Sequence, residues 1–198
     1  MNWIKHPTIL RGKHIDLLPL EEEHFSNLLE IGKQEKIWEF YSTNYANKHF
    51  LLQHLEDSIL KRSAGEKYPF TVIDKITNKI IGSTVLYNLS AEHRRLEIGS
   101  TWYDPAYWSI GYNKECKLLL LTYCFETLKT IRVQLVTDEN NHRSRKAIEG
   151  LGASFEGIIR NERIKFNGAY RNTAVYSIID TEWERVKMNL KNKIDTLQ

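Results

Sequence analysis

The residues best suited to bind an anion surround Gly111, where a strand pattern passes through a short turn into a helix pattern. β-Branched and aromatic residues occur between Ile98 and Tyr103, which predicts a strand, and Asp104-Pro105 ends it. After Gly111 an apolar run continues to Phe125 without Gly or Pro, so it predicts a helix. The free N–H groups of that helix's first turn and its dipole favour a phosphate in the turn. An ordinary strand-to-helix connection with one glycine is the alternative.

The turn resembles the acetyl-CoA-binding motif of the GNAT superfamily of N-acyltransferases. The resemblance is closest to the branch of the ribosomal-protein N-terminal alanine acetyltransferases. That motif reads Gln or Arg, two residues, Gly, one residue, then Gly or Ala. Here Trp108-Ser-Ile-Gly111-Tyr-Asn113 occupies it, with Trp108 in the Gln/Arg position, Asn113 in place of the small residue and Gly111 as the strict match.

A second segment, residues 141–153, resembles the superfamily's other signature: Asn, two residues, Ser or Ala, then Ala and a closing Leu-Gly. Asn141, Ser144, Ala147, Leu151 and Gly152 are all in register with it. Two signatures in the right order, separated by one helix and one strand, are far more specific than either alone. By propensity, Asn141 could simply cap a helix and Ser144 could be a solvated hydroxyl.

The order of elements predicts an α+β fold with α/β/α layers, which is the order of the GNAT fold. We expect a mixed, mostly antiparallel seven-stranded sheet with helices on both faces, in a single domain over residues 1–198. The tail from Thr181 is polar, with Trp183 as an anchor. The expected strands are 14–18, 68–74, 80–86, 98–103, 132–137, 154–164 and 170–179, and the expected helices are 21–31, 48–62, the run after Gly111, and 142–151.

The resemblance implies where acetyl-CoA binds. Pantetheine would pair with the backbone of Thr101, Trp102 and Tyr103, in a gap between the fourth and fifth strands. The remaining residues implied at the cofactor are Trp108, Ser109, Ile110, Gly111, Tyr112, Asn113 and Lys114 around the pyrophosphate, and Asn141, Arg145 and Lys146 on the second signature. The basic residues could equally be a solvated face.

The resemblance also implies the catalytic and acceptor residues. Ser144 would lie near the sulfur and assist the departing thiolate, and Glu97 would act as a base through water. A structural ion pair with Arg94, Arg95 or a lysine is the alternative for Glu97. Trp38 and Tyr41, with Phe40 and Tyr45 nearby, would line the acceptor pocket, although packing between helices explains these aromatics equally well.

Composition bounds the remaining possibilities. The chain has 198 residues, 41% hydrophobic and 27% charged, and its net charge of +3 is too small to indicate nucleic-acid binding by itself. No apolar run approaches membrane-spanning length and the N-terminus lacks a signal-peptide core, so we expect a cytoplasmic protein without a membrane partner.

Cys116 and Cys124 would lie about 12 Å apart along one helix, too far for a disulfide. No metal-ligand spacing occurs, so we expect no metal.

These observations predict an acetyl-CoA-dependent N-acetyltransferase that acts on a primary amine, either a protein N-terminus or a small molecule, as a monomer or homodimer. A non-catalytic acyl-CoA-binding regulatory module is the alternative. A basic RNA- or ribosome-associated protein is a third hypothesis, and the modest charge does not support it.

Overall fold

The computed structural model describes residues 2–195 and arranges them around one sheet of eight strands in the order β1-β2-β3-β4-β5-β6-β8-β7. Every neighbouring pair is antiparallel except β5 and β6. One strand more than expected is present because two residues ahead of the first predicted strand pair with it. The strands are β1 (Leu10–Arg11), β2 (Ile15–Pro19), β3 (Tyr68–Asp74), β4 (Lys79–Ser90), β5 (Arg95–Tyr103), β6 (Arg132–Asp138), β7 (Ser154–Ile164) and β8 (Tyr170–Ile179).

Helices cover both faces of the sheet, as predicted, and each face has its own hydrophobic cluster. The helices are α1 (Phe25–Gly32), α2 (Lys48–Ser63), α3 (Tyr112–Thr122), α4 (His142–Leu151) and α5 (Trp183–Asp195). Side chains of α3, α4 and α5 belong to the larger cluster, whereas α1 and α2 pack in a smaller one with Trp38 and Trp102. The predicted anchor Trp183 begins α5, a helix that the polar tail did not suggest, and its side chain is buried.

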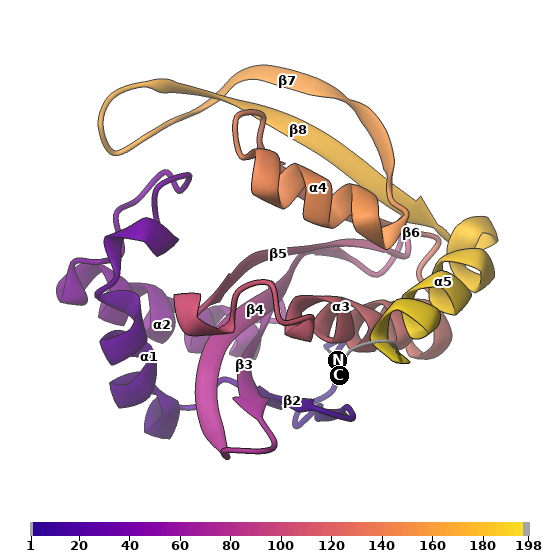
Figure 1. The fold of residues 1–198 in the computed structure, drawn as a ribbon, viewed down its shortest axis with the longest axis horizontal. Helices are drawn as coiled ribbons and strands as arrows, with labels where there is room; N and C mark the ends of the chain where they lie inside the picture. The colour runs from indigo at the N-terminus through magenta and orange to yellow at the C-terminus, as the bar shows by residue number, and fades with distance from the viewer. Residues whose placement is uncertain (1, 196–198) are drawn as a thin grey trace.

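The sheet opens between β5 and β6. These two strands pair only from Arg95–Arg132 to Glu97–Gln134. Beyond that point β5 stays with β4 while β6 stays with β8, so the two halves of the sheet diverge (Figure 1). A bulge in the β4–β5 pairing between Ser83 and Val85 turns β5 further, and Ser100 within it has a φ of 43°. Both strands therefore present unpaired backbone edges to the gap.

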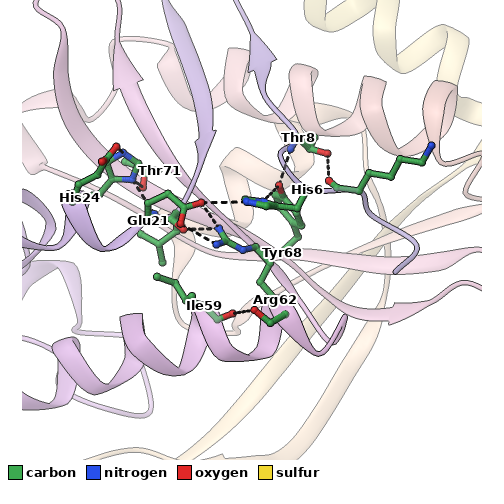
Figure 2. A network of polar contacts seen from close by, with 12 residues as sticks. His6, Thr8, Glu21, His24, Ile59, Arg62, Tyr68 and Thr71 are labelled. Carbon is green, nitrogen blue, oxygen red and sulfur yellow. Dashed lines mark hydrogen bonds and ion pairs between the residues drawn. The ribbon is translucent and has the colours of Figure 1, made fainter. Parts of the chain in front are cut away.

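A polar network joins α2 to the segment that follows β2, and joins that segment to β3 (Figure 2). The guanidinium of Arg62 lies 2.9 Å from the Glu21 carboxylate and donates to the carbonyl of Leu20 at 2.6 Å. His24 and the hydroxyl of Thr71 on β3 form a neighbouring hydrogen bond of 3.0 Å. Because Arg62 is buried, this network positions the helix pair and the segment between α1 and α2 over the sheet.

Candidate functional site

The predicted anion-binding turn is present at the start of α3. Gly111 is the N-cap residue with a φ of 96°, in the left-handed region that glycine adopts without steric cost. Ser109 also has a positive φ, 67°. Within residues 2–195, no backbone carbonyl accepts from the amides of residues 109–113, so these donors are free for a ligand. The turn therefore has the conformation and free donors expected of a phosphate site.

The first turns of α3 are held rigidly. The buried carboxylate of Glu115 accepts from the amide of Lys13, and it lies 2.8 Å from Nδ1 of His14. The hydroxyl of Tyr112 donates to Asp74 at 3.2 Å. These contacts tie the helix to the residues just before β2 and to β3, so the anion-binding amides are positioned before a ligand arrives.

The β5 edge that the resemblance assigns to pantetheine faces the gap. The side chains of Trp102 and Tyr103 are buried in the two different clusters, so they point to opposite faces of the sheet. The backbone between them forms the strand edge, because pairing with β6 ends at Glu97. The hydroxyl of Tyr41 reaches this edge and donates to the carbonyl of Thr101 at 3.3 Å. Burial raises the pKa of Tyr41, so it remains a donor. A predicted acceptor-side residue and a predicted cofactor-side residue are thus in direct contact.

A buried lysine that the sequence analysis missed lies beside this edge. Nζ of Lys117 on α3 donates to the hydroxyl of Thr101 at 2.5 Å, and that hydroxyl also bonds Thr84 at 2.8 Å. Lys117 is 5% exposed, and no carboxylate among the described residues pairs with it. Burial lowers its pKa. Its place in an otherwise apolar helical stripe was the available signal.

Glu97 lies where β5 and β6 part, and it is 3% exposed. The hydroxyl of Tyr87 donates to one carboxylate oxygen, and the amides of Asn88 and Gln134 donate to the other at 3.0 and 3.1 Å. Burial, followed by the charge of Glu97, raises the pKa of Tyr87. The alternative of an ion pair is wrong for the described residues, because neutral donors from β4 and β6 hold this carboxylate instead of Arg94, Arg95 or a lysine.

Glu97 also borders a cavity of about 310 Å³. Polar groups dominate its wall, so water can occupy it and reach the carboxylate. Its other lining residues are Asn88, Leu89, Ser90, Arg95, Leu96, Arg132 and Gln134.

The second signature forms the start of α4. The side chain of Asn141 accepts from the amide of Ser144 at 3.0 Å, so Asn141 is an N-cap residue, as its propensity predicts. The hydroxyl of Ser144 makes no hydrogen bond with any residue in the described part of the chain. It is partly exposed and therefore free to donate to a ligand.

The basic residues of α4 have different surroundings. Arg145 donates to the hydroxyl of Tyr176 at 2.9 Å and to the carbonyl of Glu139 at 3.3 Å, so internal partners occupy it. Lys146 is exposed. Arg143 lies 3.7 Å from the centre of the Trp108 ring, a cation–π contact that joins α4 to the turn before α3. No sequence motif marked this contact.

The aromatic segment between α1 and α2 is mainly a packing unit. Trp38 is 1% exposed, donates from its indole N–H to the carbonyl of Gly32 at 2.7 Å, and packs against Tyr41, Tyr45 and Trp102 with ring centres 5.1 to 5.2 Å apart. These contacts fit the packing alternative for Trp38. Phe40 lies 5.5 Å from Nζ of Lys165 on the β7–β8 connection, so this hairpin reaches the same segment.

Other expectations concern metals, thiols and membranes. Cys116 and Cys124 are both buried and free. Among residues 2–195, no three His, Cys, Asp or Glu side chains gather as a metal site would require. None of the described helices combines the length and apolar character that crossing a bilayer demands.

Together these elements place an anion-binding turn, an open strand edge and a buried carboxylate along one gap in the sheet, and α4 begins shortly after β6, the strand on the other side of that gap. Unpaired backbone on β5 fits an extended chain with amide groups, and the turn fits a phosphate. The residues present therefore fit a pantetheine-linked pyrophosphate such as that of CoA.

The chain is similar to known proteins in sequence and in fold. The sequence model described as "Acetyltransferase (GNAT) domain" matches residues 14–154. YdaF of Bacillus subtilis, provisionally named a ribosomal N-acetyltransferase, is 32% identical over 108 residues, which cover 54% of this chain and 58% of YdaF. Two of the relatives are thus matched over little more than half their length.

Solved structures match over nearly the whole chain. A GCN5-related N-acetyltransferase from Brucella melitensis has a TM-score of 0.87 and 25% identity, covering 96% of this chain and 86% of its own. Mycobacterium smegmatis RimJ, solved in complex with CoA-disulfide, shares the fold with a TM-score of 0.81 and 16% identity over 95% of each chain. The matched domain and the gap between β5 and β6 lead to one conclusion: this chain belongs to the GNAT acetyltransferase family.

Proposed function

We propose that this protein transfers the acetyl group of acetyl-CoA to a primary amine. The observation that carries the proposal is the gap between β5 and β6, with the free amides before α3 at one end and Glu97 at the other. The RimJ complex with CoA-disulfide supports a CoA site in this fold. When bound, acetyl-CoA supplies an activated acyl group and a thiol leaving group.

The chain's own residues have separate tasks in this proposal. The amides of residues 109–113 hold the pyrophosphate, whereas the predicted amide of Lys114 is excluded because it donates to the carbonyl of Gly111 at 2.9 Å. The β5 backbone at Thr101–Tyr103 orients the pantetheine. Ser144 donates to the departing sulfur. Glu97 takes a proton from the acceptor amine through water in the adjoining cavity. Such positioning contributes more than covalent chemistry in a reaction of this type.

The acceptor we propose is a protein N-terminus or a small amine with similar acidity. An α-amino group has a pKa of about 7.7–8.0, compared with about 10.4 for lysine, so it needs less help from a base. The name of YdaF supports a ribosomal protein as one candidate acceptor.

Turnover of acetyl-CoA with a panel of amines tests the proposal. Release of free thiol that depends on both the protein and an amine is the expected result. Binding of CoA without release of thiol for any amine in the panel would favour a non-catalytic acyl-CoA-binding module instead.

A further inference from the structure

Arg171 on β8 is a buried cation without a partner. It is 8% exposed, and its Nε is fully buried without a hydrogen bond. Among residues 2–195, no carboxylate lies within ion-pair distance of it. A buried charge without a partner is costly, so proteins rarely keep one without a use for it.

A second arginine faces it across the β7–β8 hairpin. Arg163 on β7 is the direct cross-strand neighbour of Arg171. Like charges in such positions repel each other. Burial, and then the charge of Arg163, lower the pKa of Arg171, which agrees with this geometry.

The nearby acids already have partners. Asp138 lies 2.6 Å from Nζ of Lys165, while Glu162 pairs with Arg163 at 2.8 Å and accepts from Thr173 at 2.9 Å. Three cations therefore share two carboxylates, and Arg171 is the cation left over.

The two arginines face the same region as the candidate base. Along β8, Ala174, Tyr176 and Ile178 belong to the cluster under α3 and α4, so alternation places Arg171 on the opposite face. On that face, the positive charge of Arg171 counteracts part of the burial that raises the pKa of Tyr41, and the negative charge of Glu97 helps to raise the pKa of Arg163, so the two arginines lie in the same region as Tyr41 and Glu97. Tyr87 bonds Glu97, and Tyr41 bonds the β5 edge, so these arginines border the space in which the acceptor must lie.

We propose that Arg171, assisted by Arg163, binds a carboxylate on the acceptor, so that the preferred substrate is an amine that also carries an acid group. This inference rests on the proposed function and specifies its substrate class. A guanidinium offers a planar pair of donors that matches a carboxylate. The carboxylate can be that of a free amino acid or an acidic side chain near a peptide's N-terminus, and the test separates these sources.

The experiment compares amines with and without the carboxylate, and kcat/KM is expressed per neutral amine because a neighbouring carboxylate raises the pKa of the amine. One pair is serine and serinamide, and the other is two amidated tripeptides with Glu or Gln in the second position. In wild-type protein, kcat/KM should be about 10- to 100-fold higher for the acidic member of at least one pair, which identifies the source. Arg171→Met should abolish that preference while turnover of the neutral member stays within about threefold.

Arg160→Met is the matched control, because Arg160 is an exposed arginine on the same hairpin, and it should keep the preference. The melting temperature of Arg171→Met should equal or exceed that of wild type, since a buried unpaired charge is removed. A clear fall in melting temperature, or equal loss with both members of a pair, would show a structural arginine and overturn the inference.

Turnover of the neutral amines without any preference would overturn the carboxylate site and leave the proposed function standing. Preference for a phosphorylated amine such as phosphoethanolamine over both acidic members would likewise overturn it. Failure of every amine would overturn the proposed function and this inference together.

Discussion

Replacing Glu97 with glutamine tests whether this carboxylate is a proton acceptor or a structural group. The structure predicts two separable effects. Tyr87, Asn88 and Gln134 all donate to Glu97, and a glutamine offers one oxygen and one NH₂ group in place of two oxygens. One donor then faces another donor, which should cost about 1–3 kcal/mol of unfolding free energy.

The catalytic effect should be larger and should depend on pH. Losing a positioned base typically lowers the rate by about 10²–10⁴-fold. For an acceptor with a pKa of about 8, roughly a tenth of the amine is neutral at pH 7 and roughly nine-tenths at pH 9. A variant without the base depends on amine that is already neutral, so its kcat/KM should rise about tenfold across this range. Wild-type activity should rise less.

The assay measures thiol release from acetyl-CoA between pH 6.5 and 9, with denaturant titrations to confirm folding. Glu92→Gln, an identical charge change at an exposed residue of the β4–β5 turn, is the control and should behave as wild type. If Glu97→Gln loses stability but keeps kcat/KM within about threefold and the same pH profile, Glu97 is structural and the reasoning fails.

Four further predictions concern other parts of the molecule. Gly111→Val should abolish the thermal shift that CoA produces while the chain stays folded, because a β-branched side chain strains a φ of 96° and blocks a phosphate. Normal CoA affinity in this variant would mean that the phosphate binds elsewhere. Ser144→Ala should lower kcat but leave CoA affinity nearly unchanged, and an equal fall in both would indicate a binding role. Arg62→Met should lower the free energy of unfolding, measured by denaturant titration, by about 2 kcal/mol, since the partly exposed Glu21 and the Leu20 carbonyl lose their partner. An unchanged free energy of unfolding would show that the network does not stabilise the fold. Burial lowers the pKa of His54 to about 4 in the folded protein, so on acidification His54 is protonated in the unfolded chain before it is protonated in the folded one. The free energy of unfolding should therefore fall by up to about 3 kcal/mol between pH 6.5 and 4. His54→Gln should flatten that slope and exposed His49→Gln should not.

The sequence predicted the elements that local patterns encode. The turn at Gly111, the cap at Asn141 and the two faces of helices are each marked by residues close together in the chain. Helix α5 was missed although Trp183, Val186, Leu190 and Ile194 follow helical spacing, because the polar composition of the tail concealed it. The run to Phe125 leaves α-helical geometry after Thr122 for a π-helical turn, which no simple pattern predicts.

The surroundings of the site could not be predicted, because they depend on strand register. Tyr87 and Gln134 reach Glu97 from strands on either side, and which residues meet there is decided by pairing across the sheet. Arg163 and Arg171 likewise come together through the register of a hairpin with a bulge. A sequence pattern names the residues of one element, whereas these contacts join several.

The central claim is that the gap between β5 and β6 supports acetyl transfer to an amine. The most direct measurement follows free CoA and acetylated amine together, by thiol detection and mass spectrometry, in one reaction with acetyl-CoA and a reactive amine from the panel. The account predicts equal amounts of the two products, with neither formed in the Gly111→Val variant. Release of CoA without acetylated amine, or equal product formation by that variant, would contradict it.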